Sequence, residues 1–397
     1  MENKKIGCVI AYAKGQNNYG TSLQGYAMIK KILSLGYEVE IIEYDKRLSL
    51  LDKLIYVYYA LRVGAIKVLK KRMFPNRDRK KHPQYANGLK QRTKAVDAYK
   101  AKKLIPFFHR YTGYKSLVEG SKNYDVVIVG SDQVWTPLSL PNRYYNLLFV
   151  DDSVRKVAYA SSFGVSTIPT FQWKATGRYL DRFFKIGVRE QQGKVIVESL
   201  SHQEAHVVAD PTLLLSREEW EKEIAEDISE STLSNRLRAE KGQYIFCYLI
   251  SPNEEARMQA KELSLQTQLP IITIRHMEQY RAIDETIGDV APYAVDPNDF
   301  VRYISHANYV CTDSFHCTVF SIIFHRQFLT FYRTSNNDKN NRNSRIDSLF
   351  SVLGINPNHI YNGDINGIKD PVDWGDVDMK LMKLRHESMQ FLNTILQ

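Results

Sequence analysis

Cysteine is scarce in this chain, with four residues among 397: Cys8, Cys247, Cys311 and Cys317. So small a number excludes a disulfide-rich secreted scaffold and is typical of proteins whose thiols stay reduced in the cytosol. Three of them, Cys8, Cys247 and Cys311, lie in apolar, strand-like runs, where cysteine usually acts as a small buried hydrophobic residue. The cluster of Cys311, His316 and Cys317 lacks the spacing of a familiar zinc site, so we expect no metal.

Long apolar runs are also absent. No stretch reaches the roughly 18 apolar residues that indicate a membrane-spanning helix. The first residues, MENKKIGCVIAY, are too short and too strand-like for a signal peptide. Apolar residues at 44% and charged residues at 25% are ordinary values for a globular protein, and the length predicts two or three domains. We therefore expect a cytoplasmic protein.

Acidic residues are nearly missing from one segment, residues 62–103. It holds fifteen Lys or Arg residues and two acids, Asp78 and Asp97, which gives a local charge of +13. Because the whole chain carries +10, everything outside the segment sums to −3. The positive charge is therefore a property of this segment and not of the fold as a whole.

An amphipathic run enters this basic segment. It ends in Lys70-Lys71-Arg72, and its apolar residues approximate a helical stripe: Leu54, Ile55, Val57, Tyr58, Leu61, Ile66 and Leu69. This composition is typical of a helix lying on an anionic membrane surface, so residues 54–103 are interpreted as a surface for a membrane or a lipid-linked substrate. A solvated insertion that binds nothing is an equal alternative. Nucleic acid is a third, but no helix-turn-helix, RRM or zinc-finger signature supports it, and we expect no nucleic-acid partner.

The rest of the chain alternates between apolar strands and helical patterns. A strand at 6–12 is followed by a polar loop, a helix capped by Thr21 or Ser22 that ends near Leu35, and a strand at 38–44. This β-loop-α-β unit is the building block of a doubly wound parallel sheet. Further strands are predicted at 125–130, 156–164, 185–190 and 205–215.

A second α/β series follows a charged, helix-prone stretch at 216–241. Its predicted elements are strands at 243–250, 270–275, about 309–311 and 327–332, and helices at about 253–266 and 377–396. The sequence therefore predicts an α/β protein with two Rossmann-like domains facing across a cleft. The predicted parts are an N-terminal domain (1–215, with a basic helical insertion at about 52–105), a helical linker (216–241), a C-terminal domain (242–375) and a closing helix (376–397) that packs back on the N-terminal domain.

Polar residues gather where these strands end, the edge at which such sheets bind ligands. Turn and capping chemistry accounts for a single Gly-Ser-Asp. It does not account for Gln133, Trp135, Arg189 and His316, which turns do not need. The candidate cleft residues are Asn17, Tyr19, Gly20, Thr21, Gln24, Gly130, Ser131, Asp132, Gln133, Trp135, Ser161, Ser162, Arg189, Ser314 and His316.

The order of these motifs resembles that of the polysaccharide pyruvyl transferase family. The motifs are NYGTSLQ, GSDQVW, YASSFG, VRE, ADPTLLL, DSFH and NSRID, and the resemblance covers most of the chain except the basic insertion. It implies a GT-B-like pair of domains, phosphoenolpyruvate as donor and no further cofactor. It also implies an enzyme that places pyruvate on a sugar hydroxyl pair as a cyclic ketal during synthesis of capsular or other surface polysaccharide.

The resemblance associates His316 and Arg189 with donor binding and catalysis. A group that titrates near neutrality suits the proton transfers of ketal formation, so His316 is the candidate acid or base. Asp132 is the second catalytic candidate, as a base or to orient a sugar hydroxyl. Gln133 and Trp135 are candidates for the acceptor side, although Trp135 has an equal reading as a packing residue.

The sequence departs from the family at one position. Some branches carry Arg-Leu-His where this chain has Ser314-Phe315-His316, so an arginine expected on the donor anion is missing. The candidates to replace it are Arg189, Arg275, Arg333 and Arg345, with neutral hydrogen-bond donors from Ser314. A nucleotide-sugar glycosyltransferase and a non-catalytic sugar-binding relative remain as alternatives. The acceptor predicted here is a lipid-linked oligosaccharide at the inner face of the cytoplasmic membrane.

Overall fold

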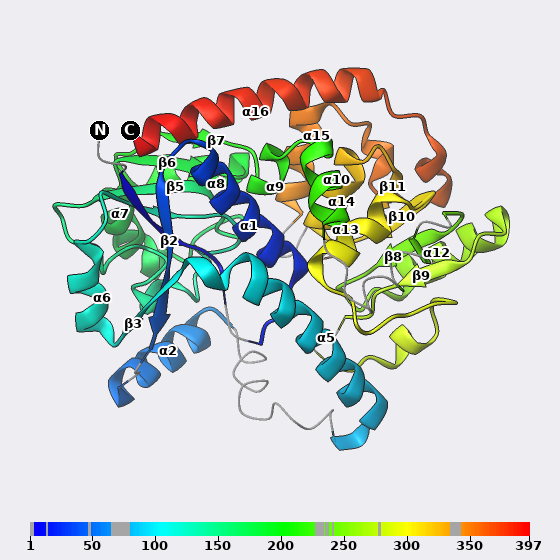
Figure 1. The fold of residues 1–397 in the computed structure, drawn as a ribbon, viewed down its shortest axis with the longest axis horizontal. Coiled ribbons are helices and arrows are strands. Elements are labelled where there is room, and N and C mark those ends of the chain that lie inside the picture. Colours follow the sequence, from blue (N-terminus) through cyan, green and yellow to red (C-terminus); the bar gives the residue numbers. More distant parts are fainter. Residues whose placement is uncertain are drawn as a thin grey trace.

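The protein folds into two α/β lobes with one long helix laid across both (Figure 1). The computed structural model describes residues 4–12, 15–46, 49–64, 80–226, 234, 238–239, 242–276, 279–333 and 343–397. Within these residues the strands form two parallel sheets. The predicted fold class is therefore confirmed, while the predicted domain boundaries stay predictions.

The N-terminal lobe is built on a seven-stranded sheet in the order β3-β2-β1-β4-β5-β6-β7. Its strands are β1 (Lys5–Val9), β2 (Glu38–Asp45), β3 (Phe108–Thr112), β4 (Val126–Val129), β5 (Arg155–Ser161), β6 (Lys185–Val188) and β7 (Ala205–Val207). The central strand β4 reads VVIV and is buried at every position, as expected for a parallel sheet covered by helices on both faces. The chain order reverses between β1 and β4, which is where doubly wound sheets bind ligands.

The C-terminal lobe repeats the plan with four parallel strands in the order β11-β10-β8-β9. They are β8 (Ile245–Tyr248), β9 (Ile271–Thr273), β10 (Tyr309–Thr312) and β11 (Gln327–Thr330). The helices of this lobe are α12 (Glu254–Thr267), α13 (Pro297–Ser305), α14 (Phe315–Ile323) and α15 (Ser344–Leu353). Those of the N-terminal lobe are α1 (Tyr19–Ser34), α2 (Leu50–Arg62), α5 (Pro83–Lys103), α6 (Tyr114–Ser121), α7 (Trp173–Leu180), α8 (Gln191–Leu200) and α9 (Pro211–Leu214).

Two helices hold the lobes together. On α10 (Arg217–Ala225), Glu219 pairs with Lys31 of α1 at 2.8 Å, and the carbonyl of Ile224 accepts a hydrogen bond from Arg302 of α13. The closing helix α16 (Trp374–Leu396) pairs Asp378 with His325 of the C-terminal lobe at 3.0 Å and hydrogen-bonds through Ser388 to the N-terminal lobe. The lobes also share one apolar core, so the two sides of the cleft are held in a fixed position relative to each other.

Two predicted elements differ from the structure. Helix α1 starts at Tyr19, because Asn18 and not Thr21 or Ser22 caps it: the Asn18 side chain accepts a hydrogen bond from Thr21 N at 3.3 Å. The strand predicted at 205–215 ends at Val207, and α9 follows, because Asp210 caps a helix that begins with Pro211.

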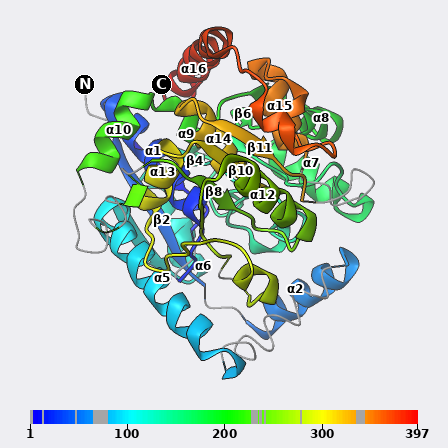
Figure 2. The same cartoon turned by 90° about the vertical axis from the view of Figure 1, so that its right-hand side faces the viewer.

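The basic insertion has two described helices, α2 and α5. Both lie on the side of the molecule opposite α16 in two perpendicular views (Figures 1 and 2). Helix α5 packs on both lobes, since Arg92 donates to the carbonyls of Tyr293 and Pro292 and Lys100 donates to that of Gln16. The predicted stripe positions Ile66 and Leu69 and the run Lys70-Lys71-Arg72 lie outside the described residues. Among the described helices, none combines the length and apolar character needed to cross a membrane.

Candidate active site

A cavity of about 720 Å³ lies between the two lobes. Its floor is formed by the carboxyl ends of strands from both sheets, and α5 closes one side through Leu89 and Arg92. Nine of the residues predicted for the cleft line it: Asn17, Thr21, Asp132, Gln133, Arg275, Ser314, His316, Arg333 and Arg345. Its size falls within the roughly 300–1,000 Å³ of small-molecule sites.

Two helices begin at this cavity. Asn18 and Thr21 of the first turn of α1 line it, as do Ser314 and Phe315 at the start of α14. The N-terminus of a helix carries free N–H groups and a partial positive charge, and both attract anions. Ser314 caps α14 through its backbone alone, without a side-chain hydrogen bond, so its hydroxyl stays available to a ligand.

Four arginines line the same cavity: Arg92, Arg275, Arg333 and Arg345. Among the described lining residues, Asp132 is the one carboxylate that faces them. Arg345 is buried, and this burial, with Arg189 and Arg333 close by, lowers the pKa of Arg345 to about 9. Gln133, with its amide oxygen toward Arg345, accepts hydrogen bonds from both terminal nitrogens at 2.9 and 3.1 Å. Arg275 also pairs with Glu285 at 3.1 Å, and Arg333 lies 3.8 Å from Asp313, but four cations to one carboxylate on the lining still favour an anionic ligand.

A buried ionic cluster lies directly behind the cavity wall and centres on Asp210. Its Oδ2 accepts hydrogen bonds from Arg189 Nη1 at 2.9 Å and Ser131 Oγ at 2.8 Å, and lies 3.7 Å from His316 Nε2. Its Oδ1 accepts from Thr212 N and Oγ1 at 3.0 and 2.7 Å. Burial opposes ionisation of Asp210, but His316 and Arg189 outweigh it and hold the pKa of this carboxyl far below its ordinary value. Asp210 therefore stays ionised, and its charge holds the His316 imidazole in place from the side away from the cavity.

Several donors in this region are buried without a hydrogen bond to the described residues. They are Arg189 Nε and Nη2, Arg345 Nε and His316 Nε2. Both guanidinium groups pack on the ring of Phe315, with centroid distances of 4.6 Å for Arg189 and 5.7 Å for Arg345. Buried donors are satisfied in almost all native proteins. Those that face the cavity therefore mark the place where a ligand oxygen belongs.

Asp132 connects the N-terminal lobe to this cluster. Its Oδ2 accepts a hydrogen bond from Thr21 Oγ1 at 2.8 Å, and its Oδ1 lies 3.9 Å from Arg189 Nη2. Burial alone would raise the pKa of Asp132, but Arg189 and His316 lower it below its usual value. Its backbone has φ = 80°, in the left-handed region that residues other than glycine rarely adopt. Strain of this kind is common at functional sites.

Gly20 makes room for His316. A Cβ atom at Gly20 would lie 2.1 Å from His316 Nδ1 and 2.5 Å from its Cγ, so no larger residue fits without moving the ring. The imidazole is therefore packed between α1 of one lobe and Asp210, with its Nε2 directed at the ionic cluster. Its position depends on both lobes.

The remaining predicted residues lie outside the cavity lining. Trp135 is buried against Phe163, Tyr179 and Phe183, and its Nε1 donates to the carbonyl of Tyr145 at 3.0 Å. It packs in the core because its ring points away from the strand end. The others support the site from behind or border it: Tyr19, Gly20, Gln24, Gly130, Ser131, Ser161, Ser162 and Arg189.

Sequence reasoning missed several residues of this region. Asp210 lies in the motif ADPTLLL but was not among the predicted site residues, because three separate elements bring it together with Arg189 and His316. Arg92 belongs to the basic insertion, which was interpreted as a membrane-facing surface or as a solvated segment, yet it lines the cavity. Tyr145 and His276 also line the cavity, and no sequence motif pointed to them. Within the described residues, no group of three or more His, Cys, Asp or Glu side chains is arranged to hold a metal ion.

Comparison with solved structures identifies the architecture. A Listeria monocytogenes protein assigned as a UDP-N-acetylglucosamine 2-epimerase superposes with a TM-score of 0.51 at 10% identity, covering 97% of this chain and 91% of that one. A glycosyltransferase from Rickettsia africae gives a TM-score of 0.49 at 11% identity, covering 100% of both chains. At such identities the first likeness shows a shared GT-B-like fold and nothing about activity. No curated protein matches the sequence significantly.

The family assignment comes from the sequence itself. The family model described as polysaccharide pyruvyl transferase matches residues 18–336, well over half of the chain. The match begins at Asn18, the cap of α1, and runs past β11, so it includes most of the cavity lining but not Arg345. The chain belongs to the polysaccharide pyruvyl transferase family, a family of enzymes.

Proposed function

We propose that the protein transfers the pyruvyl group of phosphoenolpyruvate to a pair of sugar hydroxyls as a cyclic ketal. The observation that carries this proposal is the cationic cavity, where Arg345 Nε is buried without a hydrogen bond to the described residues, beside the start of α14. Phosphoenolpyruvate bears a phosphate and a carboxylate, and arginines and helix N-termini are the groups that bind both.

Arg345 and Arg333 take the place of the arginine that is absent at Ser314. Both line the cavity beside the first turn of α14, and Arg333 Nε donates to the carbonyl of Asp313 at 2.6 Å, which aims its guanidinium across the strand end. Arg189 serves a different purpose, because it is held by Asp210 and does not line the cavity. It keeps Asp210 and Asp132 ionised and so positions the reacting groups.

The chemistry requires a balanced set of proton transfers. C3 of the donor gains one proton and becomes a methyl group, while C2 passes through an oxocarbenium-like state. Two sugar oxygens bond to C2, each losing a proton, and the C2–O bond to phosphate breaks with phosphate taking the second proton. His316 is the group in the cavity suited to carry a proton between these sites. Asp132, held ionised, orients a sugar hydroxyl by accepting its hydrogen bond.

Donor selectivity tests this proposal. Phosphoenolpyruvate is expected to raise the melting temperature, whereas a panel of nucleotide sugars is not. Arg345→Gln should weaken donor binding by roughly 10- to 100-fold, the value of a hydrogen bond to a charged group. The same variant should stabilise the free protein, because it removes a buried cation that has two arginine neighbours. Thermal shift against donor concentration measures both effects.

The control for Arg345→Gln is Arg155→Gln. Arg155 also stacks on an aromatic ring, at 4.6 Å from Phe184, but at the amino end of β5, and it does not line the cavity. It should leave the donor response unchanged. Stabilisation of the wild type by nucleotide sugars and not by phosphoenolpyruvate would contradict the proposal. The direct product test is release of phosphate together with a glycan heavier by about 70 Da, the increment that the reaction stoichiometry requires.

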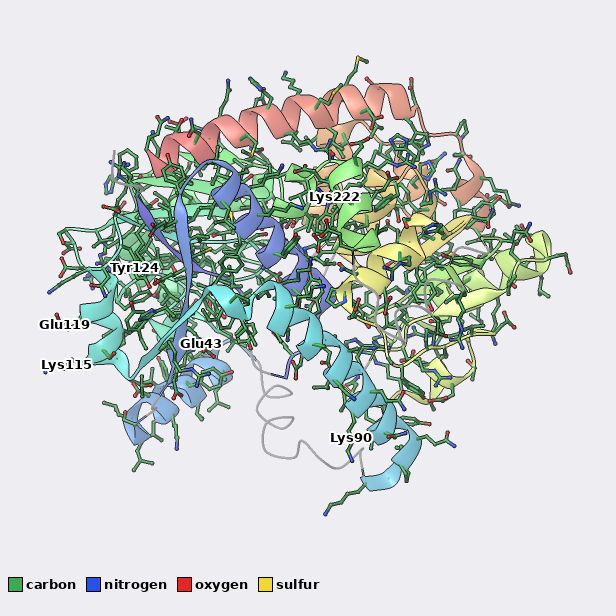
Figure 3. The ribbon with its side chains drawn as sticks, in the orientation of Figure 1. Glu43, Lys90, Lys115, Glu119, Tyr124 and Lys222 are labelled. Carbon is green, nitrogen blue, oxygen red and sulfur yellow. The ribbon has the colours of Figure 1, made fainter. Side chains whose placement is uncertain are left out.

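We further infer a lipid-linked oligosaccharide acceptor at the cytoplasmic membrane face, reached through α2 and α5. Five side chains on α2 leave more than half of their surface exposed: Leu50, Leu51, Leu54, Tyr58 and Leu61. Exposed lysines stand on the same side of the molecule, near or on α5: Lys80, Lys81, Lys90 and Lys94 (Figure 3 labels Lys90). An apolar stripe beside basic residues is the pattern of a helix that rests on anionic lipid.

Vesicle flotation tests this membrane contact. The double variant Leu54→Gln/Leu61→Gln should weaken binding to vesicles with anionic lipid by about 100-fold or more, because each buried leucine contributes about 1.5 kcal/mol or more. Leu265→Gln on α12 is the matched control, since Leu265 is equally exposed at 69% but far from the basic segment. Equal flotation of wild type and double variant would rule the contact out.

A further inference from the structure

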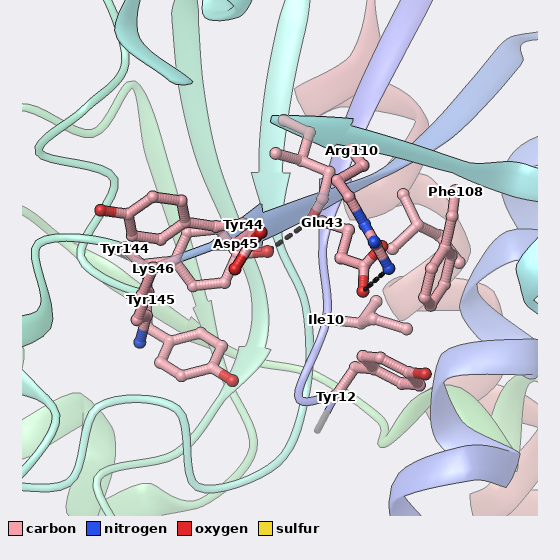
Figure 4. Close-up of a pocket in the computed structure, with 12 residues that line it drawn as sticks. Ile10, Tyr12, Glu43, Tyr44, Asp45, Lys46, Phe108, Arg110, Tyr144 and Tyr145 are labelled. Carbon is pink, nitrogen blue, oxygen red and sulfur yellow. Dashed lines mark hydrogen bonds and ion pairs between the residues drawn. The ribbon is translucent and has the colours of Figure 1, made fainter. Parts of the chain in front are cut away.

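A second cavity of about 430 Å³ lies at the carboxyl end of β2. It adjoins the main cavity, because Tyr12 and Tyr145 line both. Figure 4 shows two groups of side chains around it: Tyr44, Lys46, Tyr144 and Tyr145 on one side, and Ile10, Tyr12, Glu43, Phe108 and Arg110 on the other. The two cavities therefore share part of their walls.

The two cavities differ in charge. The main cavity carries four arginines against Asp132. In the second, Glu43 and Asp45 balance Lys46 and Arg110. Arg110 makes two hydrogen bonds to Glu43, with Nε–Oε2 at 2.8 Å and Nη2–Oε1 at 3.1 Å. A cavity without net charge gives no advantage to phosphate or nucleotide, and its carboxylate oxygens and cationic nitrogens match the hydroxyl groups of a neutral ligand.

Aromatic rings dominate the walls of the second cavity. Phe108 meets Tyr12 edge to face at 4.7 Å, and Tyr44 packs on Tyr144 at 5.7 Å. Tyr12, Tyr44, Tyr145 and Phe108 are each only partly buried, so they present surface to a ligand. Rings of this kind offer large, rigid contact area together with a polar tip on tyrosine. Rings alternating with charged hydrogen-bonding groups match a sugar, which has an apolar C–H face and a rim of hydroxyls.

We propose that this second cavity is a subsite for the acceptor glycan, which binds the sugar units next to the one that receives pyruvate. The proposal rests on the function proposed above and deepens it, because it assigns a neutral part of the acceptor oligosaccharide to a defined set of residues. The reacting sugar lies near Asp132 and His316, and the chain leaves past Tyr12 and Tyr145 toward Tyr44 and Phe108.

The test uses the full chain and two measurements. Wild type, Phe108→Ala and Tyr44→Ala are applied to an array of neutral bacterial surface oligosaccharides, and each is titrated with phosphoenolpyruvate by thermal shift. Neither Phe108 nor Tyr44 lines the main cavity. Phe184→Ala is the matched control, since Phe184 is a partly exposed ring (49%) at a distant site.

We expect wild type and Phe184→Ala to bind the same oligosaccharides and to prefer chains of two or more units. Each cavity variant should bind them roughly three- to tenfold more weakly, the effect of losing one aromatic contact, with the donor response unchanged. Unaltered glycan binding by both variants overturns the subsite, as does a wild type that binds no oligosaccharide. In either case an intact donor response leaves the proposed reaction standing, whereas loss of that response in the wild type counts against the reaction itself.

Discussion

Replacement of His316 by alanine is expected to lower turnover by about 10²–10⁴-fold, the usual contribution of a general acid or base. The imidazole lines the cavity, its Nε2 is 3.7 Å from the ionised Asp210, and its side chain is only 10% exposed. No other described lining residue combines a titratable ring with that support. Donor affinity should change far less than turnover, because Arg345 and Arg333 remain to bind the anion.

The measurement is phosphate release from phosphoenolpyruvate in the presence of a lipid-linked glycan extract. Glutamine is similar in size to histidine and can form hydrogen bonds, but it cannot transfer protons. His316→Gln should therefore be as inactive as His316→Ala. His325→Ala is the control: His325 also pairs with an aspartate, Asp378 at 3.0 Å, but at the end of α14 away from the cavity. Turnover of both His316 variants within about threefold of wild type would remove His316 from the chemistry.

The variant Gly20→Ala tests the role of His316 by displacing its ring without replacing the residue. In Gly20→Ala the new methyl group would clash with the imidazole at 2.1 Å and push it from its place. Since a displacement of about 1 Å costs up to 10²-fold in rate, turnover should fall by roughly that factor. Alanine is favoured over glycine in a helix, so the melting temperature gives a separate readout of folding.

Much of this architecture is encoded locally, and that part was predictable. The buried strand VVIV and the polar residues that follow it are adjacent in sequence, so the sheet and its ligand-binding edge follow from periodicity alone. Asp132 and His316 were found because each comes directly after a strand. Both lie in the observed cavity.

The features that the sequence did not reveal depend on contacts between distant elements. Nothing near Arg189 in the sequence shows that Asp210 holds its guanidinium away from the cavity. Trp135 follows a strand as Asp132 does, but three aromatic rings from other segments draw it into the core. Arg92 reaches the cavity because α5 packs across both lobes, which charge counting over residues 62–103 could not reveal.

Asp210→Asn is expected to destabilise the protein by about 3–5 kcal/mol, the cost of leaving a buried charge without its partner. Asp210 is 1% exposed and accepts hydrogen bonds from Arg189, Ser131 and Thr212. Asparagine keeps the size of the side chain and removes the charge. The free energy of unfolding in urea at neutral pH measures the loss.

Asp152→Asn is the matched control for Asp210→Asn. Asp152 pairs with Arg182 at 2.9 Å, the same distance as Asp210 with Arg189, but its side chain is 89% exposed. An exposed ion pair contributes little to stability because solvent screens it, so this variant should be nearly as stable as wild type. If both variants lose the same free energy of unfolding, the buried cluster stabilises the protein no more than an exposed ion pair does.

The pH dependence distinguishes a charge effect from a packing effect. The folded-state pKa of Asp210 is lowered, so its stabilising contribution is complete above the pKa of an unfolded aspartate, about 3.9, and is lost as the pH falls below that value. The difference in stability between wild type and Asp210→Asn should therefore be constant from neutral pH down to about pH 5 and shrink in stronger acid. A packing defect would give a difference that does not change with pH, and urea unfolding across this range separates the two.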